Sequence, residues 1–231
     1  MNSRGLICVS VMATDSEAVL AAATPVLALA DVIEIRLDGL RDPLDLGCIG
    51  AIAKPILATN RPIWEGGRFN DSEEKRIDAL CMALAHGARY VDIELAAAPQ
   101  LRARLLAAAH AHGAQTIVSS HDFATTPSTP QLSATLEAMI ASGADIGKIV
   151  TTAATPNEAL RILALQQEAR AAGFPLCAFA MGAAGTISRL ATLYLGGFMT
   201  YAALSQEQAT APGQIAVRDL HNLLALLEPA S

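Results

Sequence analysis

The chain is poor in aromatic residues, in positive charge and in clustered cysteines. Aromatic side chains make up 4% of the 231 residues, and the net charge is −6. This balance disfavours a nucleic-acid partner, because phosphate binding needs a basic face and single strands need rings to stack on. The four cysteines, Cys8, Cys48, Cys81 and Cys177, lie far apart with no C-x-x-C pair, which is typical of reduced thiols in a cytoplasmic protein.

Long apolar runs are also missing, although 52% of the residues are hydrophobic. The longest runs, Ala18–Ala30 and Pro175–Ile187, are shorter than the ~18 residues that a membrane-spanning helix needs. The N-terminus has no basic segment followed by an apolar one, so we expect no signal peptide. The sequence therefore predicts a cytoplasmic protein that does not enter a membrane.

What the chain does contain is a regular alternation of β-type runs and helical segments. The β-type runs are Leu6–Met12, Val32–Asp38, Pro55–Arg61, Arg89–Leu95, Gln115–His121, Ile146–Thr152, Pro175–Met181 and Phe198–Leu204. The helical segments between and after them are rich in alanine and leucine: Ser16–Ala30, Leu44–Ala53, Ser72–His86, Gln100–His112, Gln131–Ser142, Asn157–Ala172, Thr186–Leu195 and Ile215–Leu227. Such strand–helix repeats imply parallel strands.

The number of repeats favours a (β/α)8 barrel, the TIM barrel, which closes with eight strands. No linker, charge block or low-complexity tract divides the chain, so we expect residues 1–231 to form a single catalytic domain. An open doubly wound sheet is the alternative. That fold usually has a G-x-G-x-x-G turn after its first strand, whereas here Met12-Ala13-Thr14-Asp15 follows, so the open sheet ranks second.

Charged side chains share one face of several predicted strands. In Val32–Asp38, Glu34 and Arg36 alternate with apolar residues, and a side chain changes face at every residue of a strand. The same alternation gives Asp92 and Glu94, Thr59 and Arg61, and Ser119 and His121. A barrel interior normally holds Val, Ile and Leu, so these groups must pair or bind something. A structural ion-pair network is the alternative, and it is favoured for Asp92 and Glu94.

Lys148 lies inside the apolar run Ile146–Val150, where a lysine is costly to bury. Burial disfavours the charged form of an amine, and a neutral amine is a nucleophile for carbonyl carbon. The alternative is a lysine that reaches out of an edge strand or pairs with a buried carboxylate. His121 is suited to proton transfer at neutral pH, Glu65 could orient it, and arginines suit a substrate carboxylate.

A metal site is disfavoured, because the chain has no H-E-x-x-H motif and no clustered carboxylate spacing. His110 and His112 could share an ion on a strand, but on the predicted helix their side chains point ~200° apart. We therefore expect no metal and no cofactor.

Seven segments, in order, resemble the type I 3-dehydroquinate dehydratase family. They are Glu34–Asp38, Thr59–Gly67, Val91–Glu94, Ser119–Phe123, Asp145–Ile149, Met181–Arg189 and Ala211–Gln214. Each one alone is weak, but together they span almost the whole chain. The resemblance implies a lyase of the shikimate pathway, in aromatic amino-acid biosynthesis, that dehydrates 3-dehydroquinate to 3-dehydroshikimate without a cofactor. It also suggests a homodimer.

The resemblance assigns a role to each matching residue. It implies that Lys148 forms a Schiff base with the substrate ketone, that His121 moves protons, and that Glu65 orients His121. The residues expected to bind substrate are Glu34, Arg36, Arg61, Arg189, Thr210 and Gln214. Arg189 matches the carboxylate-binding arginine, and Thr210 stands where the family usually has serine. The polar segment Ser205–Gln214 is expected to close over the ligand.

Two other functions remain open. A class I aldolase, or another imine-forming lyase on the same barrel, would also use Lys148, although the arginines and the Gln214 segment favour a compact carboxylated polyol over a sugar phosphate. A catalytically silent binding or sensor protein could keep the pocket, but it would often have lost one of Lys148, His121 and Glu65.

Overall fold

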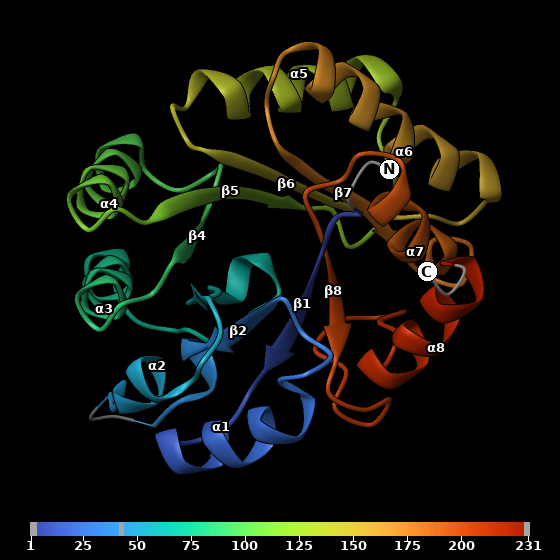
Figure 1. The fold of residues 1–231 in the computed structure, drawn as a ribbon. Coiled ribbons are helices and arrows are strands. Elements are labelled where there is room, and N and C mark those ends of the chain that lie inside the picture. Colours follow the sequence, from blue (N-terminus) through green and yellow to red (C-terminus); the bar gives the residue numbers. More distant parts are fainter. Residues whose placement is uncertain (1–3, 42–43, 229–231) are drawn as a thin grey trace.

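A computed structural model describes residues 4–41 and 44–228, which form a parallel β-barrel surrounded by helices (Figure 1). The eight strands hydrogen-bond in the order β7-β6-β5-β4-β3-β2-β1-β8. β7 and β8, at the two ends of this order, come together where the amide of Phe198, just before β8, donates to the Leu176 carbonyl at 2.8 Å, so the barrel is nearly closed. The predicted single-domain (β/α)8 barrel is therefore confirmed, and the open sheet is wrong.

The strands agree closely with the predicted runs. They are β1 Leu6–Val11, β2 Val32–Arg36, β3 Ile56–Thr59, β4 Tyr90–Glu94, β5 Gln115–His121, β6 Ile146–Thr152, β7 Leu176–Met181 and β8 Met199–Ala203. The boundaries of β5 and β6 are as predicted. β2 ends two residues before Asp38, because the chain turns into the 3-10 helix η2, Leu37–Gly39.

The helices lie outside the strands. They are α1 Ser16–Ala23, α2 Gly47–Ala51, α3 Glu73–Ala85, α4 Pro99–Ala111, α5 Thr129–Ala141, α6 Pro156–Ala171, α7 Thr186–Tyr194 and α8 Val217–Leu227, with the 3-10 helices η1 Thr24–Val26 and η3 Ile63–Glu65. Two predicted helices were too long. α1 gives way to η1 around Pro25. The helix predicted at Leu44–Ala53 begins only at Gly47, whose amide donates to the Asp45 carboxylate at 2.9 Å. The prediction that residues 1–231 form one domain includes 1–3, 42–43 and 229–231, which lie outside the described residues.

The barrel interior is divided along its axis. Inward-facing residues near the strand starts are apolar, and they pack as one cluster that includes Val32, Leu57, Ile117, Ile146 and Met199. Two residues further along each strand, the inward positions are polar and buried: Glu34, Thr59, Asp92, Ser119 and Lys148. Because all strands are parallel, these polar residues gather at the carboxyl-terminal half of the barrel, where barrel enzymes carry their active sites.

No helix within residues 4–41 and 44–228 combines the length and the apolar character that crossing a bilayer requires.

The loop between β3 and α3 is folded tightly back on itself. The Gly67 amide donates to the Pro62 carbonyl at 2.9 Å, and the Phe69 amide donates to the Arg61 carbonyl at 3.0 Å. A Cβ added at Gly67 would lie 1.9 Å from the Arg61 carbonyl oxygen, which leaves no room for a methyl group. Glycine at this position therefore fixes the path of the segment that carries Glu65.

We predict that Gly67→Ala lowers the free energy of unfolding by about 1–3 kcal/mol, because the backbone of Arg61 must move to admit the methyl group. Gly50→Ala is the matched control. Gly50 is an exposed residue of α2 whose nearest neighbour to an added Cβ is 3.9 Å away, so this variant should gain up to about 1 kcal/mol. Urea unfolding of both variants tests the difference, and equal midpoints would contradict it.

Candidate active site

Lys148 lies at the centre of the polar half of the barrel. It is the third residue of β6 and is only 5% exposed. Its Nζ donates to Oδ2 of Asp92 at 3.3 Å, and it lies 4.0 Å from the ring centroid of Tyr201. The amine is thus held inside the barrel and does not reach out past an edge strand. It keeps a carboxylate partner, as the structural alternative required, while it still lines the central cavity.

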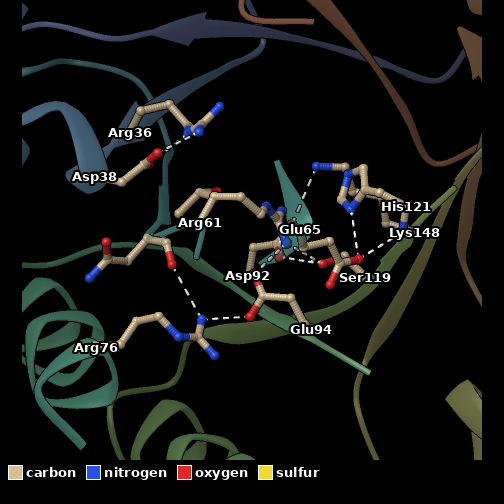
Figure 2. Close-up of polar contacts among 12 residues, drawn as sticks. Arg36, Asp38, Arg61, Glu65, Arg76, Asp92, Glu94, Ser119, His121 and Lys148 are labelled. Carbon is tan, nitrogen blue, oxygen red and sulfur yellow. Dashed lines mark hydrogen bonds and ion pairs between the residues drawn. The ribbon is translucent and has the colours of Figure 1, made fainter. Parts of the chain in front are cut away.

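Arg61 organises the carboxylates around the lysine. Its guanidinium lies 2.8 Å from Asp92 Oδ1 and 2.5 Å from Glu94 Oε1, and it donates to the Ser119 hydroxyl at 2.7 Å (Figure 2). Burial opposes ionisation of Asp92, but the charges of Arg61 and Lys148 outweigh it and hold the pKa of Asp92 below its usual range. Asp92 is therefore a carboxylate, and a poor base, beside Nζ.

Glu94 has a second cation on its other side. Arg76, from α3, is completely buried, and its guanidinium lies 2.5 Å from Glu94 Oε2. Arg76 also pairs with Glu73 at 2.7 Å, on the partly exposed first turn of α3. The structural network favoured for Asp92 and Glu94 is thus present. Asp92 differs from Glu94 in that it also contacts the amine, which parity alone did not predict.

His121 and Glu65 form a hydrogen-bonded pair across the mouth of the barrel. One oxygen of Glu65, Oε1, accepts from the backbone amide of His121 at 2.7 Å and lies 3.0 Å from its Nδ1. Burial lowers the pKa of His121 well below its usual range, and Arg61 and Lys148 lower it further. His121 is therefore a neutral imidazole at neutral pH. With Nδ1–H donated to Glu65, its Nε2 is left as a proton acceptor.

Glu65 is itself perturbed. Burial raises its pKa to about 7, although Arg61 and the amide of His121 favour the ionised form. The pair can thus gain or lose one proton near neutral pH, which is the range in which general acid–base groups work best.

Arg189 is a buried cation without a carboxylate partner among the described residues. It is 2% exposed at the start of α7, and its Nη2 donates to the Pro212 carbonyl at 3.0 Å. Its Nε has no hydrogen-bond partner within residues 4–41 and 44–228. Burial lowers its pKa to about 10, so it remains charged at neutral pH. An unpaired buried charge is costly, and an anion that entered the cavity would offset that cost.

The remaining predicted residues complete the wall of the cavity. Glu34 accepts hydrogen bonds from the hydroxyls of Ser10 and, at 2.8 Å, Thr59. Arg36 forms a two-point pair with Asp38 at 2.8 and 2.6 Å. In the loop after β8, Gln214 Oε1 accepts from the amide and the hydroxyl of Thr210, at 2.7 and 3.2 Å. That loop lies over the cavity and is joined to α7 through Arg189 and Pro212.

All nine residues predicted from the sequence line this one cavity: Glu34, Arg36, Arg61, Glu65, His121, Lys148, Arg189, Thr210 and Gln214. The sequence reasoning missed other residues of its wall, among them Ser10, Phe123, Phe179, Met181 and Tyr201. The signal was available for the residues of β7 and β8, because Phe179 and Met181 share the inward parity of β7, and Tyr201 that of β8. In the part of the chain that the structure describes, no group of three or more His, Cys, Asp or Glu side chains is placed to hold a metal ion.

Comparison with known proteins agrees with this geometry. Residues 7–231 match the sequence model of the family described as Type I 3-dehydroquinase. The chain belongs to the type I 3-dehydroquinase family. It is 38% identical to the 3-dehydroquinate dehydratase of Desulfotalea psychrophila over 85% of this chain and 87% of that one, and 39% identical to the enzyme of Methanosarcina barkeri over 86% of each.

Solved structures of the family have the same fold. The type I 3-dehydroquinate dehydratase of Clostridium difficile superposes with a TM-score of 0.87 at 26% identity, over 98% of this chain and 93% of that one. The enzyme of Geobacillus kaustophilus gives 0.86 at 30% identity, over 96% and 91%. The 3-hexulose-6-phosphate synthase barrel, at a TM-score of 0.60 and 22% identity, shares only the fold. The chain is thus an enzyme of this family by sequence and by architecture.

We predict that kcat/KM falls as the pH drops through about 7, because protonated Glu65 no longer accepts the Nδ1–H of His121 as a carboxylate does. Glu65→Gln cannot ionise, so it should lower kcat/KM by roughly 10- to 100-fold and remove this acidic limb. Glu17→Gln, at an exposed carboxylate of α1, is the matched control and should keep the limb. An unchanged limb in Glu65→Gln would assign the ionisation to another group.

Proposed function

We propose that this chain dehydrates 3-dehydroquinate to 3-dehydroshikimate and water through a Schiff base on Lys148. The observation that carries the proposal is a buried primary amine in the same cavity as a neutral histidine and an arginine that has no carboxylate partner among the described residues. Membership of the type I 3-dehydroquinase family supports it. So does the Clostridium difficile relative, whose structure was determined with covalent modified comenic acid.

Binding of the substrate would use the groups that line the cavity. Its carboxylate would pair with Arg189, whose Nε–H has no partner in the described part of the chain. Its ring hydroxyls would meet the carboxylate of Glu34 and the guanidinium of Arg36, which have opposite charge and form a polar wall. These contacts would set the ketone carbon against the Lys148 nitrogen.

Imine formation would begin when the ammonium of Lys148 gives one proton to the neutral imidazole of His121. The free amine attacks the ketone carbon, and the carbinolamine loses its hydroxyl as water after His121 returns that proton to it. The product of this step is an iminium with one positive charge, which acidifies the carbon–hydrogen bond beside it. Asp92 stays ionised through this step because of its pairing with Arg61.

Elimination would use His121. Its neutral imidazole takes the proton from the carbon next to the iminium, and the electron pair moves to the nitrogen to give an enamine. The enamine then expels the hydroxyl β to the former ketone, which leaves as water with the proton from His121. Hydrolysis of the conjugated iminium by one water molecule releases the neutral enone product and restores the ammonium of Lys148. Glu65 would hold His121 in one orientation throughout.

The wider context is proposed on the same basis. The reaction would belong to the shikimate pathway, in the cytoplasm, with no metal and no cofactor. We also propose a homodimer, for which the exposed leucines Leu223, Leu226 and Leu227 on α8 offer an apolar face.

We predict that Lys148→Ala lowers turnover at least about a thousandfold, roughly 4 kcal/mol of barrier, and leaves the fold intact. The fold should survive because Asp92 keeps Arg61 and Ser119 as partners. The measurements are the absorbance of the enone and the mass of the protein after incubation with 3-dehydroquinate and borohydride. Wild type should gain one adduct, on Lys148. Turnover without any adduct would refute the imine, and an inert wild type would refute the activity.

We also predict that activity survives exhaustive treatment with EDTA, because the proposed steps use only side chains of this chain. Enone formation is measured before and after dialysis against the chelator. A loss of activity that added divalent metal restores would contradict the proposed chemistry.

A further inference from the structure

Lys148 touches an aromatic ring that the steps above do not use. Its Nζ lies 4.0 Å from the ring centroid of Tyr201, which is the third residue of β8 and 4% exposed. On another side the same nitrogen faces Asp92 at 3.3 Å. The amine is therefore held between a fixed negative charge and the negative face of a ring.

We propose that Tyr201 is a catalytic residue whose ring face stabilises the positively charged nitrogen of the Lys148 imine. This inference rests on the proposed Schiff-base reaction. It assigns to the ring the stabilisation of positive charge on this nitrogen, in the iminium as in the resting ammonium. The free amine and the carbinolamine between them are neutral, so the ring favours the step that restores the charge as the iminium forms.

The contact involves the ring and does not involve the phenol group. The nitrogen lies over the centroid, and the Tyr201 hydroxyl is buried with no hydrogen-bond partner among the described residues. Burial raises the pKa of this hydroxyl well above its usual range, so the phenol is neutral and adds no charge. The geometry thus predicts that a phenyl ring can do much of what the tyrosine does.

A ring also has a property that a carboxylate lacks. An imine activates the neighbouring carbon–hydrogen bond only while its nitrogen is protonated. A basic group beside that nitrogen could remove the proton, but an aromatic face attracts the cation and cannot accept the proton. The ring therefore favours the reactive form without competing with His121 as a base.

A second ring, Phe179, contacts the other cation of the site, Arg189. Phe179, on β7, lies 4.9 Å from the guanidinium carbon of Arg189, and its centroid is 6.0 Å from that of Tyr201. Each ring thus contacts one cation. Phe179 contacts the arginine that is proposed to bind the carboxylate, and Tyr201 contacts the nitrogen that is proposed to form the imine. Loss of the Phe179 ring should affect binding, and loss of the Tyr201 ring should affect the chemical step.

The test compares Tyr201→Leu, Tyr201→Met and Tyr201→Phe. We expect the Leu and Met variants to lower kcat roughly 10- to 30-fold, the size of effect of a desolvated cation–π contact, with a smaller change in KM. Tyr201→Phe keeps the ring and should turn over about tenfold faster than either. At a fixed substrate concentration, the fraction of Lys148 trapped by borohydride should likewise be larger in Tyr201→Phe than in the Leu and Met variants. Phe179→Leu should instead raise KM more than it lowers kcat.

Tyr90→Leu is the matched control. Tyr90 is a buried tyrosine in the apolar half of the same barrel and does not line the cavity, so removal of its ring should leave kcat unchanged. Circular dichroism and thermal unfolding show whether each variant is folded. If Tyr201→Leu does not fold, Tyr201→Met, which fills more of the space left by the ring, replaces it in the comparison. If Leu and Met match Phe in kcat and in trapping, the role of the ring is overturned while the imine stands. If wild type itself is not trapped, the proposed function fails first.

Discussion

The pairing of Arg61 with Asp92 and Glu94 is the interaction on which the rest of the site depends. Buried charges are tolerated only when they are paired and hydrogen-bonded, and these three are almost fully buried. Arg61 lets Asp92 stay ionised beside Lys148, and Arg76 balances Glu94 from the outer layer of the barrel. A continuous chain of ion pairs therefore runs from Arg76 on α3, through Glu94, Arg61 and Asp92, to the amine of Lys148.

The pairing of buried charges is incomplete at Arg189, where we propose that the substrate carboxylate binds. Arg61 pairs with two carboxylates, whereas the partners of Arg189 among the described residues are a backbone carbonyl and the face of Phe179. Removal of water from the two arginines costs a similar amount, but only Arg61 is compensated within the protein. An anion that enters the cavity compensates Arg189. A carboxylate on the substrate would thus supply the charge that the folded chain lacks at that point.

Much of this could be predicted from the sequence, because two simple periodicities govern a barrel. Strand–helix alternation predicted the fold, and the change of face at every strand residue predicted that Glu34, Arg61, His121 and Lys148 meet in one cavity. The missed features depend on contacts across the barrel. Asp92 reaches Lys148 from β4, and Tyr201 reaches it from β8; neither strand pairs with β6. Periodicity says which face a side chain occupies, but not which partner it meets there.

The charge on one nitrogen explains why this arrangement suits an imine. In the proposed reaction, the Lys148 nitrogen would be positive as the ammonium, positive again as each iminium, and neutral only in between. Asp92 and Tyr201 face that single point and need not move as the intermediates change, which is the advantage of a preorganised site. Because Arg61 keeps the pKa of Asp92 low, Asp92 is a poor acceptor for the protons of the nitrogen. In the proposed reaction, proton transfer is thereby left to the neutral imidazole of His121, while Asp92 and the Tyr201 ring face the positive charge.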